Sequence, residues 1–158
     1  MRLPLYFLAV SGGALVQSTI APVFGVGAVV PDVPVILVAL LALRRGPEAG
    51  CLTGFALGLA QDVIAGGPVG VHALSKAVIG FGVGDLPRWF LVSRPLVSVI
   101  IATLATVVDG TLRFVSLQYF HYPAPFGELL AGVILPQAGY NGVLAALAVS
   151  LPPLWSRR

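Results

Sequence analysis

Apolar stretches, separated by short polar segments, run through the whole chain. A helix needs about 20 mostly apolar residues to cross the roughly 30 Å hydrocarbon core of a membrane. The pattern predicts six membrane-spanning helices, at residues 3–20, 26–43, 49–65, 69–83, 96–115 and 129–151. Pro31, Asp32 and Pro34 interrupt the second near its start, so it is either a full span or a short helix with a re-entrant lead-in, and five spans are the alternative.

The composition supports an integral membrane protein. Apolar residue types make up 58% of the chain and charged residues only 9%, whereas a soluble domain typically carries about 25% charged residues. So few charges cannot cover a surface that faces water, which excludes a soluble globular domain, a disordered tail and a nucleic-acid-binding protein. We expect one all-α membrane domain over residues 1–158, with no loop long enough to hold a catalytic domain.

The basic residues predict how the helices are oriented. If the N-terminus is cytoplasmic, the segments on that side hold seven of the nine cationic side chains, namely Arg2, Arg44, Arg45, Arg88, Arg94, Arg157 and Arg158. The opposite segments, residues 21–25, 66–68 and 120–128, hold none. An excess of basic residues marks the cytoplasmic side of a membrane protein. Both termini are therefore predicted to be cytoplasmic, and the net charge of +3 needs no nucleic-acid partner.

Four charged side chains fall inside the predicted spans, where charges are costly unless they are paired. Asp62 and Lys76 flank the short loop between the third and fourth helices at similar distances, which predicts an ion pair between them. Asp109 and Arg113 are four residues apart in the fifth helix. With the acid first, this spacing favours an ion pair within one helix.

Further polar side chains extend this set. His72 precedes Lys76 by four residues, and Gln137 and Asn141 are four residues apart in the sixth helix. We expect a polar interior in the outer half of the bundle. It either locks the helices together, forms a pocket for a small polar ligand or a lipid headgroup, or lines a path for an ion or a proton. A single histidine in a membrane is more typical of a hydrogen-bonded packing residue than of a metal ligand.

No catalytic residue, metal site or cofactor is predicted. The single cysteine, Cys51, excludes a disulfide within the chain and a cysteine-based metal cluster. The sequence has no phosphate-binding loop, no dinucleotide-binding glycine fingerprint and no metalloprotease motif.

Glycines recur at helical spacing on two neighbouring helices. Gly50, Gly54 and Gly58 form a row on the third, and Gly80 and Gly84 lie on the fourth. Small residues let helix backbones approach closely in a membrane. These rows are used either for packing within the bundle or for docking the helix of a partner.

Several short motifs follow one another between residues 11 and 85. They are Gln17-Ser18, Pro31-Asp32, Leu43-Arg44-Arg45-Gly46, the glycine row that continues through Gly54-Phe55 and Gly58-Leu59 to Asp62, and Gly67-Pro68-Val69-Gly70 followed by Ala73-Leu74. This ordered set resembles MreD, the rod shape-determining membrane protein family of bacteria.

The resemblance implies a multi-pass protein of the bacterial cytoplasmic membrane that is a non-enzymatic part of the machinery for lateral cell-wall synthesis. Its implied direct partner is MreC, which has one transmembrane helix. The wider assembly implied by the resemblance contains the actin-like MreB, the glycan polymerase RodA and a class B penicillin-binding transpeptidase. The cytoplasmic arginines Arg44, Arg45, Arg88 and Arg94 would contact anionic lipid or MreB. Association into a homodimer is left as an open alternative.

The family is also similar in architecture to the substrate-binding subunits of ECF vitamin transporters, which makes such a ligand-binding subunit the main alternative. That subunit would need a row of small residues on its first span. The corresponding row here, Ala9, Gly13 and Gln17, matches this requirement poorly. A channel or proton-coupled carrier would need a continuous polar path, and the inner halves of the predicted spans are too apolar for one.

Overall fold

A computed structural model describes residues 10, 12–27, 29–86, 95–119 and 125–150. Within these residues the secondary-structure elements are all helices, as predicted. The elements are a π-helical turn η1 (Val16–Ile20), a 3₁₀ turn η2 (Ala21–Phe24), α2 (Val33–Arg45), α3 (Pro47–Ala65), α4 (Val71–Gly84), α5 (Pro95–Tyr119), α6 (Phe126–Leu129), a second π-helical turn η4 (Leu130–Ile134) and α7 (Leu135–Ser150). Arg2, Arg88, Arg94, Arg157 and Arg158 lie outside the described residues.

The second helix is shorter than the predicted stretch 26–43, because it begins only at Val33. Asp32 caps it, and its carboxylate accepts a hydrogen bond of 3.2 Å from the backbone N–H of Val35. Acidic residues are favoured at this position because the first N–H groups of a helix have no partner within the helix. Pro34 in the first turn suits a helix start, because its missing N–H is not needed there. The structure therefore has the short helix of the two alternatives.

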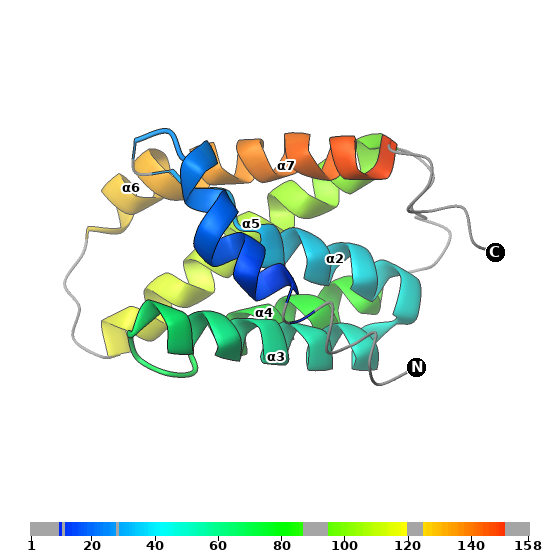
Figure 1. The fold of residues 1–158 in the computed structure, drawn as a ribbon, viewed down its shortest axis with the longest axis horizontal. Coiled ribbons are helices and arrows are strands. Elements are labelled where there is room, and N and C mark those ends of the chain that lie inside the picture. Colours follow the sequence, from blue (N-terminus) through cyan, green and yellow to red (C-terminus); the bar gives the residue numbers. More distant parts are fainter. Residues whose placement is uncertain (1–9, 11, 28, 87–94, 120–124, 151–158) are drawn as a thin grey trace.

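Helix α2 lies at the centre of the molecule, between α7 on one side and α3 with α4 on the other, while α5 crosses the layers obliquely (Figure 1). Its residues Val35, Ala39 and Leu43 share one face and pack against α4 and α5. Ile36 and Leu40 form the neighbouring row and pack against α5 and α7. A helix that is apolar on all sides is expected at the centre of a bundle.

Helices α3 and α4 form a hairpin in which the two backbones touch. A Cβ atom at Gly50, Gly54 or Gly58 would overlap backbone atoms of α4, and one at Gly80 would overlap the backbone of Gly50. Gly84 packs in the same way against the start of α3. All five glycines of the two rows are therefore used inside the hairpin, which decides between the two uses that the sequence left open.

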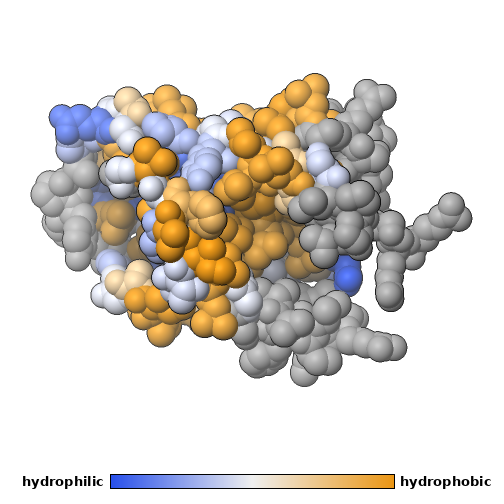
Figure 2. Space-filling view, turned by 45° about the horizontal axis from the view of Figure 1, so that its top comes forward, coloured by the Kyte–Doolittle hydropathy of each residue, from blue (hydrophilic) through white to orange (hydrophobic). Residues whose placement is uncertain are grey.

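The outer surface carries many large apolar side chains, and Figure 2 shows them spread over much of one face. Leu52 on α3, Leu104 on α5 and Leu147 on α7 are each exposed by more than half. Extended apolar surface of this kind marks a protein that contacts membrane or other proteins. Two helices, Leu96–Tyr119 and Phe126–Ser150, are long and apolar enough to cross a membrane.

Candidate functional site

A fully buried lysine lies at the centre of the polar interior. The Nζ atom of Lys76 on α4 is 3.0 Å from Oδ2 of Asp32 and 3.5 Å from Oδ2 of Asp109 on α5. Arg113 completes a group of two acids and two bases, which we call the ionic cluster (Asp32, Lys76, Asp109 and Arg113). Its formal charges cancel, as is required of charges removed from water.

Asp109 is the acid that joins the two bases. Its Oδ2 atom lies 2.9 Å from Nε of Arg113, one helical turn along α5, so the pair expected from their spacing is present. Its Oδ1 atom accepts a hydrogen bond of 2.8 Å from the Ser75 hydroxyl on α4. Asp109 therefore connects Arg113 on its own helix to Lys76 and Ser75 on α4.

The predicted ion pair between Asp62 and Lys76 is wrong. The Asp62 carboxylate instead accepts hydrogen bonds from the backbone N–H groups of Gly70, His72 and Ala73, at 2.8, 3.0 and 3.2 Å. The cause is the register of the hairpin. Gly54 packs on the backbone of Lys76, so Asp62, two turns further along α3, lies at the first turn of α4. Unpaired N–H groups at a helix start attract a carboxylate.

The acid that pairs with Lys76 was missed in the sequence, where Asp32 counts only as a helix break. In the structure Asp32 is 3% exposed, and its Oδ1 atom also receives a long contact of 3.5 Å from Nε2 of Gln61. One signal points to it in retrospect. Asp32 stands where an N-cap is expected, two residues before Pro34 at the start of a buried helix.

Residues 29–32, called the lead-in below, are the non-helical segment before α2, and amide side chains satisfy their backbone. Oδ1 of Asn141 on α7 accepts from the N–H of Asp32 at 3.0 Å. Gln137 donates to the Val30 carbonyl. Gln17 donates to the carbonyl of Pro31 at 3.1 Å and accepts from the N–H of the residue after Asp32 at 2.9 Å. Non-helical backbone inside a membrane needs such partners because lipid offers none.

His72 connects the start of α4 to the ionic cluster. Its Nδ1 atom is 2.7 Å from Oδ1 of Asp62, and its Nε2 atom is 3.4 Å from Nη1 of Arg113. Nη2 of Arg113 is also 3.4 Å from Oε1 of Gln137. Within the described residues, no three His, Cys, Asp or Glu side chains gather in a way that could hold a metal ion.

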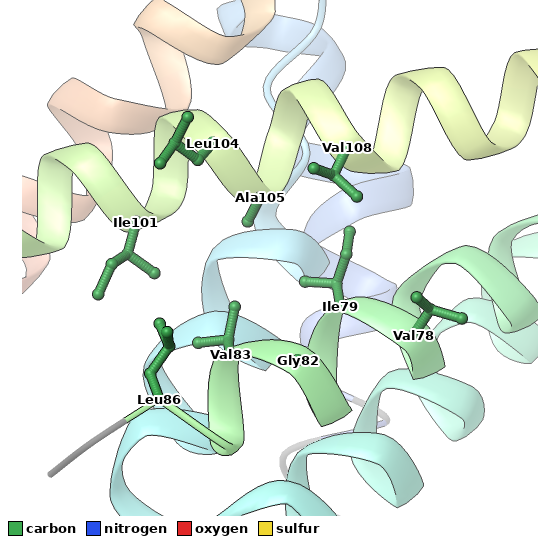
Figure 3. Close-up of a pocket in the computed structure, with 9 residues that line it drawn as sticks. All are labelled: Val78, Ile79, Gly82, Val83, Leu86, Ile101, Leu104, Ala105 and Val108. Carbon is green, nitrogen blue, oxygen red and sulfur yellow. The ribbon is translucent and has the colours of Figure 1, made fainter.

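His72 lines two hollows beside these groups. One, of about 240 Å³, lies between residues 14–18 and α3, and the other, of about 310 Å³, lies among α4, α5, η4 and α7. A separate apolar groove of about 280 Å³ lies between α4 and α5. Figure 3 shows Ile79 and Val83 on α4 and Ile101 and Ala105 on α5 pointing toward one another across this groove.

Comparison with known protein families identifies a match over nearly the whole chain. The family model of the rod shape-determining protein MreD matches residues 2–149. The matched region contains the lead-in, the whole ionic cluster, the glycine-packed hairpin and both amides of α7. Neither the curated proteins nor the solved structures include a match to this chain.

Proposed function

The chain belongs to the MreD family of rod shape-determining proteins, and we propose that it is a non-enzymatic scaffold of the bacterial machinery for lateral cell-wall synthesis. The family consists of structural membrane proteins that determine cell shape. The match over residues 2–149 is the observation that carries this proposal. The ionic cluster supports it, because its contacts join α2, α4 and α5 to one another.

We propose that the chain crosses the cytoplasmic membrane six times with both termini in the cytoplasm. Arg44 and Arg45 support this orientation, since they are exposed in the last turn of α2. The 13 residues of α2 rise only about 20 Å at 1.5 Å per residue. The lead-in would complete this crossing. Its backbone would then lie within the membrane, which explains why amide side chains form hydrogen bonds with it.

We propose that the direct partner is MreC and that its single transmembrane helix docks in the groove between α4 and α5. The glycine rows of the hairpin are already occupied, so a partner needs another close approach. Gly82 lines the groove and has open space where a Cβ atom would stand. Val78, Leu104 and Val108 beside it are about half exposed. Packing against a glycine is a main source of helix association in lipid.

Co-purification from detergent tests this proposal. Gly82→Leu fills the groove and should lower the amount of MreC recovered by about tenfold, the loss expected from about 1.4 kcal/mol of docking energy. Gly139→Leu on α7 is the matched control, because Gly139 also has open space but lies away from the groove. Equal recovery with both variants would contradict the docking face.

The proteins that co-purify with the unmodified chain test the function itself. A scaffold of the elongation machinery should recover MreC, and MreB, RodA and a class B penicillin-binding transpeptidase through it. Recovery of ATPases with a transporter module in place of MreC would contradict the scaffold and favour a vitamin-binding transport subunit.

A further inference from the structure

The cavity of about 310 Å³ combines one charged group with apolar walls. Arg113, His72 and Gln137 supply its polar side chains, while Phe114, Leu117 and neighbouring aliphatic residues make up most of the remaining surface. Its size is at the lower end of the range for small-molecule sites. Such a lining suits a ligand that has a small polar head and an apolar body.

Arg113 lines this cavity, and its terminal nitrogens make only long contacts with other side chains. A guanidinium group carries five N–H donors. The contacts of Nη1 with His72 and of Nη2 with Gln137 are both 3.4 Å long, well beyond the usual 2.9–3.0 Å for such a bond. Nε is fixed by the Asp109 carboxylate at 2.9 Å. The terminal nitrogens make only the two long contacts, so they can take up a stronger acceptor.

Arg113 shares its acid with a second base. Asp109, its partner, is shared with Lys76 at 3.5 Å and receives the Ser75 hydroxyl at 2.8 Å. Asp62 accepts hydrogen bonds from three backbone N–H groups and contacts His72, so it does not compete for Arg113. A planar guanidinium with free terminal N–H groups matches two oxygens of a phosphate at once.

We propose that this cavity binds the phosphate group of an anionic lipid, with Arg113 on the phosphate and the lipid chain against the apolar walls. Free inorganic phosphate would present the same oxyanion to Arg113 as the lipid headgroup does. The walls favour the lipid, because the lipid chain gains by burial against Phe114 and Leu117, whereas a free phosphate only loses water there. This inference goes beyond the scaffold role, and it is tested without MreC, so its failure leaves the proposed function untouched.

Calorimetric titration of the full chain in an uncharged detergent distinguishes a lipid phosphate from free phosphate as the ligand. The probes are dihexanoyl phosphatidate, inorganic phosphate and dihexanoylglycerol. We expect phosphatidate to bind about tenfold more tightly than either of the others, because only it satisfies both the guanidinium and the apolar walls. If inorganic phosphate binds equally well, the lipid is wrong. If dihexanoylglycerol does, Arg113 has no role in binding.

Two tryptophan variants on α5 test the location. Leu117→Trp fills the cavity and should weaken phosphatidate binding about tenfold, because the lipid chain loses its space. Val115→Trp is the matched control, since Val115 is 59% exposed and does not line the cavity. Equal binding by the two variants would overturn the proposal.

Arg113→Lys tests the geometry of recognition. It keeps the charge but cannot contact two oxygens from one plane, and we expect binding to weaken about fivefold or more. Its elution in gel filtration shows whether the fold is kept. Unchanged binding would exclude a bidentate contact. If this variant unfolds, the comparison of the three probes on the unmodified chain still decides.

Discussion

The α3–α4 hairpin and the lead-in of α2 are held together in opposite ways. In the hairpin, glycines bring two consecutive helices into backbone contact, and the partners are neighbours in the chain. At the lead-in, the backbone forms hydrogen bonds with side chains of helices that are remote in the sequence. Asn141, for example, lies 109 residues from Asp32. Burial of apolar surface drives little helix association in lipid. A membrane protein must therefore use close packing where the backbone is regular and polar side chains where it is not.

The largest effect is expected where the two regions meet, at Lys76. Lys76→Met leaves Asp32 and Asp109 buried without their shared cation, and we expect a loss of about 3–5 kcal/mol in the free energy of unfolding. Denaturation of the detergent-solubilised protein measures it. Arg45→Met removes the same charge from an exposed position and should cost less than about 0.5 kcal/mol. Similar losses in both would show that Lys76 is not buried among these acids.

The hairpin should be sensitive to a single methyl group. Gly54→Ala places a Cβ atom on the backbone of Lys76, so we expect a loss of about 3 kcal/mol from overpacking. Gly139→Ala on α7 meets open space and should be neutral or stabilising by up to about 1 kcal/mol, because alanine is the better helix former. Unfolding curves of the two variants provide the comparison, and a stable Gly54→Ala protein would contradict the backbone contact.

The lead-in should respond more mildly. Asn141→Leu leaves the N–H of Asp32 without its acceptor, at a cost of about 1–3 kcal/mol. Hydrogen exchange followed by mass spectrometry should show faster exchange in the peptide that contains residues 29–36, while the peptide that contains residues 50–58 of the hairpin stays protected. Uniformly faster exchange would mean that Asn141 supports the whole bundle instead of this segment.

The smallest effect concerns the corrected pairing. Asp62→Asn combined with Lys76→Met should show a coupling energy below about 0.5 kcal/mol, because the two side chains belong to different contacts. Asp32→Asn combined with Lys76→Met should couple by more than about 1 kcal/mol. The reverse order of the two coupling energies would restore the pair expected from the sequence.

Helical periodicity explains which of these features were accessible from the sequence. Residues four apart share a helix face, so Asp109 with Arg113 and the row of Gly50, Gly54 and Gly58 are visible without a structure. The partner of Lys76 was not, because Asp32 lies 44 residues away and in a segment without periodicity. The amides Gln137 and Asn141 stood out as polar residues, yet their acceptors and donors on the lead-in have no local signature.

The sequence by itself determined that the chain is helical and apolar, which positions within each helix face the same way, and which family it resembles, because these properties depend on composition and on short-range spacing. Only the tertiary structure decided that the glycine rows are consumed by the hairpin, that Asp32 and not Asp62 neutralises Lys76, and that Arg113 keeps free donors beside a cavity. These outcomes depend on the register and approach of helices distant in the chain. A shift of one helical turn is enough to change which charges meet.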